Sequence, residues 1–111
     1  MNYNQKKFRP ISNSSNGEVS SEMIFLYEQI DDLVFCSYQG EKIKKGHLIG
    51  KVDGEGKIDM RYHQVNSSGE MQTGICTSTP EFLPNGKIRL YEKWKWTSGD
   101  FSAGESILEE V

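Results

Sequence analysis

The chain has 111 residues, of which 35% are hydrophobic types, and its formal net charge is −3. This length suits a single domain over residues 1–111, and the apolar content excludes a wholly disordered chain. The acidic balance lacks the basic surplus of nucleic-acid-binding domains, so we expect no nucleic-acid partner. No apolar run approaches the roughly 18 residues that cross a bilayer, and the first residues lack an apolar signal core. We therefore expect no membrane partner and a cytoplasmic location.

Residues 1–6 are polar, and we expect them to be frayed. After them, turn residues recur at short intervals between runs rich in β-branched and aromatic residues. An Asn-Gly pair between apolar runs is a strong hairpin signal, because both central residues of a type I′ turn need φ above zero. In this interpretation the glycines belong to turns. The predicted turns are Asn16-Gly17, Asp31-Asp32, Gly40, Asp53–Gly56, Ser68-Gly69, Asn85-Gly86 and Ser98-Gly99.

The runs between these turns predict eight strands. Residues 21–30 could instead be helical, since Met23, Leu26 and Ile30 have helical spacing, but the β-rich run within them favours a strand. Residues 103–111 could form a terminal helical turn. The predicted strands cover residues 7–14, 22–30, 33–39, 42–52, 57–66, 70–80, 87–96 and 101–109.

Short strands joined by tight turns predict an all-β fold, built as an antiparallel up-and-down meander. Closure of the meander removes exposed strand edges. We therefore expect a small barrel of about eight strands, of the lipocalin or avidin kind. Such a barrel encloses room for packed side chains or for one small ligand.

The turns also predict which side chains face the interior, because a hairpin turn sets the residues that oppose each other. Centring the last turn on Ser98-Gly99 places Glu92 opposite Glu105. Trp94 and Trp96 then share the inner face with this carboxylate pair.

Two earlier turns extend the predicted inner face to neighbouring strands. A turn centred on Asn85-Gly86 places Thr77 and Thr79 opposite Trp94 and Glu92, respectively. A turn centred on Ser68-Gly69 brings Tyr62 and Gln64 to the same side. A three-residue loop at Ser68-Gly69 is the alternative, and we expect it to turn Asp59, Arg61 and His63 inward, which is less favourable.

The inner polar and aromatic residues form a candidate ligand pocket. Two opposed buried carboxylates cannot both ionise cheaply, so the pKa of one should rise. Such a pair could hold an amine or a sugar, or act as general acid and base. Alternatively, Arg9 or water satisfies the pair, or Glu105 lies at an exposed rim. The candidate binding residues are Tyr62, Gln64, Thr77, Thr79, Glu92, Trp94, Trp96 and Glu105.

Other motifs favour structural roles. In Lys93-Trp94-Lys95-Trp96, strand alternation separates the lysines from the rings, which argues against a single-strand nucleic-acid site. His47 and His63 face outward without converging ligands, so we expect no metal. Cys36 and Cys76 are expected to be buried and reduced. No phosphate-binding glycine loop leads into a helix, and we expect no cofactor.

Most of the chain resembles a group of small bacterial proteins that often carry the label n-acetylglutamate synthase. The similar stretches are EVSSEMIFLY (18–27), GHLIGKVDGEGKIDMRYHQVN (46–66), TGICTSTPEFLPNGKIRLYEKWKW (73–96) and GESILEEV (104–111). The resemblance implies acetyl transfer from acetyl-CoA to glutamate. The chain lacks the Arg/Gln-x-x-Gly-x-Gly/Ala turn and following helix that would bind the coenzyme pyrophosphate.

We therefore predict a small-molecule-binding module with a polar and aromatic interior. The alternatives are an enzyme that uses Glu92 and Glu105, including the labelled acetyltransferase, and a structural barrel whose core is filled. A polar-lined cavity at Glu92 would favour ligand binding, and solid aromatic packing would favour the structural alternative.

Overall fold

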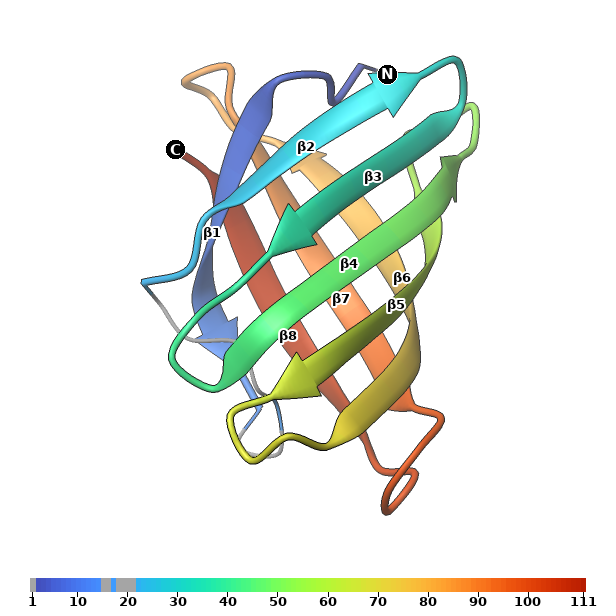
Figure 1. The fold of residues 1–111 in the computed structure, drawn as a ribbon. Coiled ribbons are helices and arrows are strands. Elements are labelled where there is room, and N and C mark those ends of the chain that lie inside the picture. Colours follow the sequence, from blue (N-terminus) through green and yellow to red (C-terminus); the bar gives the residue numbers. More distant parts are fainter. Residues whose placement is uncertain (1, 15–16, 18–21) are drawn as a thin grey trace.

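Buried and exposed side chains alternate along most strands, which is the pattern of a sheet with one face toward a core. The computed structural model describes residues 2–14, 17 and 22–111, and these form a closed antiparallel barrel (Figure 1). The strands are β1 (Lys6–Asn13), β2 (Phe25–Ile30), β3 (Leu33–Tyr38), β4 (Ile43–Val52), β5 (Ile58–Asn66), β6 (Met71–Phe82), β7 (Ile88–Trp96) and β8 (Ala103–Glu110).

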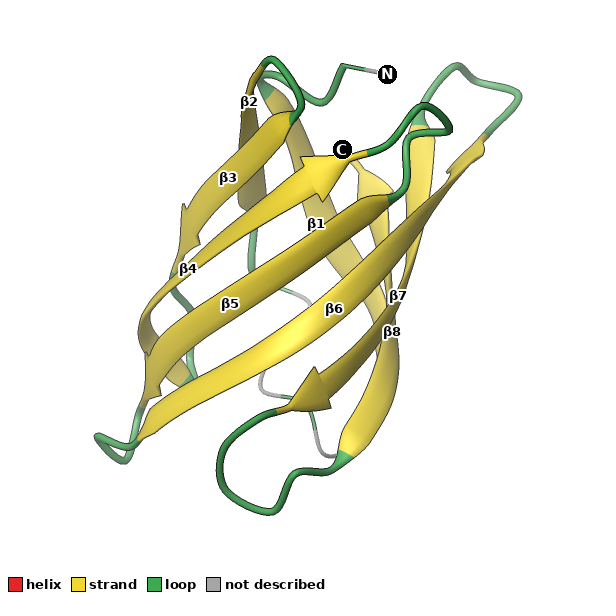
Figure 2. Ribbon diagram, turned by 90° about the vertical axis from the view of Figure 1, so that its right-hand side faces the viewer, coloured by secondary structure: helices red, strands yellow, loops and turns green. Residues whose placement is uncertain are grey.

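Each strand pairs with the next in the chain, and β8 pairs with β1 to close the barrel. The predicted all-β meander barrel of eight strands is therefore confirmed. Figure 2 shows strands β4 to β7 running obliquely across the barrel wall, the tilt that closure of a sheet requires. No helix capable of crossing a membrane is present in the part of the chain that the structure describes.

The same three-residue loop joins β4 to β5, β5 to β6 and β6 to β7. In each loop the third residue is a glycine with φ near +85°, and its amide bonds to the carbonyl of the residue before the loop. This is a type I turn followed by a left-handed residue, a conformation that glycine adopts without a steric cost. The three glycines are Gly56, Gly69 and Gly86.

These loops correct the predicted register of β6. The two-residue turns at Ser68-Gly69 and Asn85-Gly86 are wrong, because the flanking pairs are Asn66 with Glu70 and Leu83 with Lys87. The three-residue alternative at Ser68-Gly69 therefore occurs. With this loop β5 keeps its predicted inner face, whereas the side chains of β6 that were predicted to face inward point outward.

A longer loop shifts β8 in the same way. The amide of Trp96 bonds to the carbonyl of Ser102, and both Gly99 and Phe101 have positive φ in between. Consequently Trp94 opposes Gly104, one position away from the predicted register. The predicted Asn16-Gly17 turn includes a residue outside the described part of the chain.

One end of the barrel is closed by the segment that precedes β1. Residues 1–6 were expected to be frayed, but the Tyr3 side chain is fully buried beside Phe8 and Tyr27. The Tyr3 hydroxyl donates a hydrogen bond to the carbonyl of Gly56, which reaches the β4–β5 loop. The Tyr3 amide donates to the side chain of Gln29 at 2.8 Å. This end of the barrel therefore has a packed aromatic plug.

Glycines within strands seat the aromatic rings of the interior. Gly46 opposes Tyr38, and a Cβ on this glycine would overlap the tyrosine ring. In the same way Gly74 opposes Tyr62, and Gly104 opposes Trp94. The interpretation that the glycines belong to turns is wrong for these positions, where the missing side chain makes room for a ring on the neighbouring strand.

We predict that Gly104→Ala destabilises the fold by roughly 1–3 kcal/mol, a typical overpacking cost. The added methyl group would overlap the buried Trp94 ring, which is only 8% exposed and has little space into which to move. Urea unfolding would measure the loss.

Gly54→Ala is the matched control, because a Cβ at Gly54 meets nothing within 4 Å. Its free energy of unfolding should stay equal or rise slightly. Equal stability of the two variants would contradict the role assigned to Gly104.

Candidate functional site

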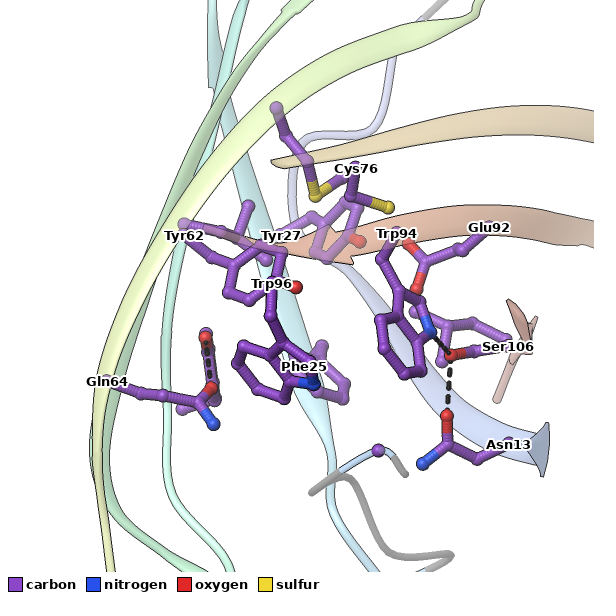
Figure 3. Close-up of a pocket in the computed structure, with 15 residues that line it drawn as sticks. Asn13, Phe25, Tyr27, Tyr62, Gln64, Cys76, Glu92, Trp94, Trp96 and Ser106 are labelled. Carbon is purple, nitrogen blue, oxygen red and sulfur yellow. Dashed lines mark hydrogen bonds between the residues drawn. The ribbon is translucent and has the colours of Figure 1, made fainter. Parts of the chain in front are cut away.

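The barrel interior contains a cavity of about 70 Å³, which is space for several water-sized groups. Its wall is largely aromatic, and a few polar side chains lie among the rings (Figure 3). The aromatic lining residues are Phe25, Tyr27, Tyr38, Tyr62, Trp94 and Trp96. The other lining residues are Asn13, Gly17, Leu48, Met60, Gln64, Cys76, Glu92, Ser106 and Leu108.

The structure divides the predicted pocket residues into two groups. Tyr62, Gln64, Glu92, Trp94 and Trp96 line the cavity. Their strands, β5 and β7, have the inner faces that the sequence predicted.

The remaining predicted residues lie on the outside of the barrel. Thr77, Thr79 and Glu105 are exposed, because β6 and β8 are turned over relative to the predicted register. Glu92 therefore opposes Ser106, and Glu105 opposes Lys93. The predicted carboxylate pair does not exist.

The correct register brings in residues that the sequence analysis missed. Ser78 replaces the threonines as the inward polar group of β6, and Ser106 replaces Glu105 on β8. A three-residue loop ending in glycine would have identified Ser78. Tyr27 and Asn13 carried no sequence signal, since they lie in strands for which no hairpin register was derived.

The aromatic side chains contact each other at steep angles. The ring centroids of Trp94 and Trp96 are 5.8 Å apart, and the angle between the ring planes is 63°. The ring centroids of Tyr62 and Trp96 are 5.6 Å apart, with an angle of 73° between the planes. On strands β2 and β3, the ring centroids of Phe25 and Tyr38 lie 5.1 Å apart. The two contacts of Trp96 are edge-to-face, an arrangement that aromatic pairs prefer.

Two hydrogen-bonded groups hold polar side chains in place. The Trp94 Nε1 donates to Ser106 Oγ at 2.7 Å, and Ser106 donates onward to Asn13 Oδ1 at 2.8 Å (Figure 3). The Tyr38 hydroxyl donates to Gln64 Oε1 at 2.9 Å, and Gln64 Nε2 donates to Gln72 at 3.0 Å. These networks fix the rotamers of the wall before any ligand binds.

Glu92 is the one carboxylate among the lining residues, and its side chain is partly buried. Ser78 Oγ donates to Glu92 Oε2 at 2.7 Å, while no lysine, arginine or histidine lines the described cavity. Burial raises the pKa of Glu92 to about 7, although the hydrogen bond from Ser78 opposes this shift. The carboxyl group therefore changes charge near neutral pH.

The Tyr27 hydroxyl is a second unusual group in the cavity. It is buried and has no hydrogen-bond partner among the described residues. Burial raises its pKa, and the nearby negative charge of Glu92 raises it further. A buried hydroxyl without a partner normally costs free energy, so this atom is well placed to bond to a ligand.

Of the other sequence candidates, the two histidines and Cys36 do not line the cavity, whereas Cys76 does. Cys36 and Cys76 are free and buried, as predicted. His47 and His63 stack on the outer face of β4 and β5 with ring centroids 5.6 Å apart. Within the described residues, no group of three or more His, Cys, Asp or Glu side chains could hold a metal.

Comparison with known proteins identifies one family. A family model described as "Avidin-like protein" matches residues 1–111. No curated protein and no solved structure matches the chain.

We predict that Glu92→Gln stabilises the protein at pH 8 and flattens its pH dependence. The folded pKa of about 7 lies above the unfolded value of 4.5, so ionisation of Glu92 lowers stability as the pH rises between these values. The gain at pH 8 should be at most about 3 kcal/mol, and it should vanish below about pH 4.5. Urea titrations across this range would measure it.

Glu105→Gln is the control, because this side chain is exposed and the charge change is the same. Its unfolding free energy should follow the wild-type pH dependence. Parallel pH profiles for wild type and the Glu92 variant would show that Glu92 is fully solvated.

Proposed function

Because the chain belongs to the avidin-like family, we propose that it binds a small molecule inside its barrel. Avidin-like barrels typically bind small ligands such as biotin. The cavity lined by Trp94, Trp96, Tyr62 and Glu92 carries the proposal, since it combines an apolar wall with a few fixed polar groups. Ligand sites in proteins generally have this composition.

The alternative functions have less support. A filled structural core would leave no cavity at Glu92, whereas the interior retains about 70 Å³ there. An enzyme using two carboxylates would need a second acid near Glu92, but Glu105 lies outside. Acetyl transfer gains no support either, because the described residues contain no helix whose N-terminus could hold a pyrophosphate.

We predict that protein purified from its own host retains a small molecule that denaturation releases. Native mass spectrometry would detect the added mass. Leu48→Phe and Cys76→Phe should reduce the retained fraction by about tenfold or more, because each places a ring in the cavity that these residues line.

Thr77→Phe is the matched control, since this residue follows Cys76 on β6 but faces outward. It should retain the molecule at the wild-type level. Thermal unfolding of all the variants would establish that they are folded. Equal retention by the inward and outward variants would contradict a ligand in the barrel.

A further inference from the structure

The charge balance of the cavity points to the class of ligand. Glu92 supplies the one acidic side chain of the lining, and none of the described lining residues is a cation. An isolated carboxylate in a partly buried position is costly unless a positive charge or hydrogen-bond donors compensate it. Here Ser78 supplies a hydrogen bond to Oε2, and no hydrogen bond to Oε1 exists among the described residues.

The aromatic wall favours the same kind of ligand. Trp94 and Trp96 are the two tryptophans of the chain, and both line the cavity, with Trp94 next to Glu92 (Figure 3). Tryptophan gives the strongest cation–π attraction, and aromatic cages are the usual recognition site for quaternary ammonium groups. The tryptophan rings and the carboxylate of Glu92 therefore both favour a positively charged ligand.

On these grounds we propose that the ligand is a small organic cation, a protonated amine or a quaternary ammonium compound, held between Glu92 and the two tryptophan rings. This inference rests on the proposed function and specifies its ligand class. A protonated amine has only donors. It could therefore donate both to Glu92 and to the Tyr27 hydroxyl oxygen, which has no partner among the described residues.

Other ligand charges fit less well. An anionic ligand would lose its hydration and would be repelled by the carboxylate of Glu92, which no cation of the described lining compensates. A neutral ligand would leave the ionised carboxylate unpaired, so it would bind best when Glu92 is protonated. The selectivity between cation and neutral ligand should consequently change with pH.

The other titratable groups around Glu92 do not produce this change. The titratable groups that its charge affects across the barrel interior are Tyr27 of β2, Tyr38 of β3, Tyr62 of β5 and Cys76 of β6. Burial raises the pKa of each, so all of them stay uncharged between pH 5 and pH 8. β8 contributes Ser106, which does not titrate.

The test uses two cations, each with a neutral counterpart of similar shape. The pairs are choline with 3,3-dimethylbutan-1-ol and n-butylamine with n-butanol. Because both tryptophans line the cavity, their fluorescence reports directly on its occupancy. At pH 8 each cation should bind at least about tenfold more tightly than its neutral counterpart, which corresponds to about 1.4 kcal/mol.

Variants identify the group responsible. Glu92→Gln should weaken binding of the cations by about tenfold and should leave binding of the alcohols at pH 8 unchanged or stronger, because it removes the unpaired charge. In wild type, lowering the pH from 8 to 5 should weaken cation binding in the same way, and the variant should lose this dependence. Glu105→Gln, on the outer face, should bind all four probes like wild type.

The outcomes separate this inference from the proposed function. If alcohols bind as tightly as cations, the ligand class is wrong. If Glu92→Gln keeps the selectivity, the proposed role of Glu92 is wrong. In both cases binding in the barrel stands. If none of the probes binds, the inference is also overturned. In that case retention of a host molecule, lost in Leu48→Phe, would still support the proposed function, and its absence would remove both.

Discussion

In each of three loops, one glycine in the left-handed conformation determines which side chains point into the barrel. Gly56, Gly69 and Gly86 each end a three-residue loop with φ near +85°, which fixes the pairing of the strands on both sides. Because side chains alternate along a strand, a shift by one residue would exchange the inner and outer sets completely. The cavity, its polar groups and its charge all depend on these loops.

The position of Glu92 links stability to ligand selection. Burial raises the pKa of this carboxyl to about 7, so its ionised form exists in the empty barrel only at a cost in free energy. The same ionised form would attract a cation most strongly. A ligand that supplies positive charge would therefore stabilise the barrel most above neutral pH. In that range the ionised Glu92 lowers the free energy of unfolding of the unliganded protein. Ser78 lowers this cost by its hydrogen bond without removing the charge.

The sequence predicted the eight strands and the inner face of β7 because these depend on local patterns. It failed for β6 because a glycine can belong to a two-residue or a three-residue loop, and for β8 because the loop that follows Trp96 is longer than the predicted two-residue turn. The apolar pattern of these strands does not decide between the loop lengths. Ile75 on β6 and Ile107 on β8 are apolar and favour the wrong inner face, but the structure leaves Ile75 exposed and Ile107 half-buried. The role of Gly104 depends on its neighbour across the sheet, Trp94, which no local pattern reveals.

The two ends of the barrel differ, and the residues of the candidate site lie at different distances from them. Tyr3 is packed against Phe8 at one end, where the chain termini lie (Figure 1). Along β7, Glu92, Trp94 and Trp96 follow each other toward the opposite end. In the proposed site the tryptophan rings therefore lie toward the end opposite the aromatic plug, and the carboxylate lies farther from that end. The rings would select for shape and cationic character, and Glu92 would hold the charge.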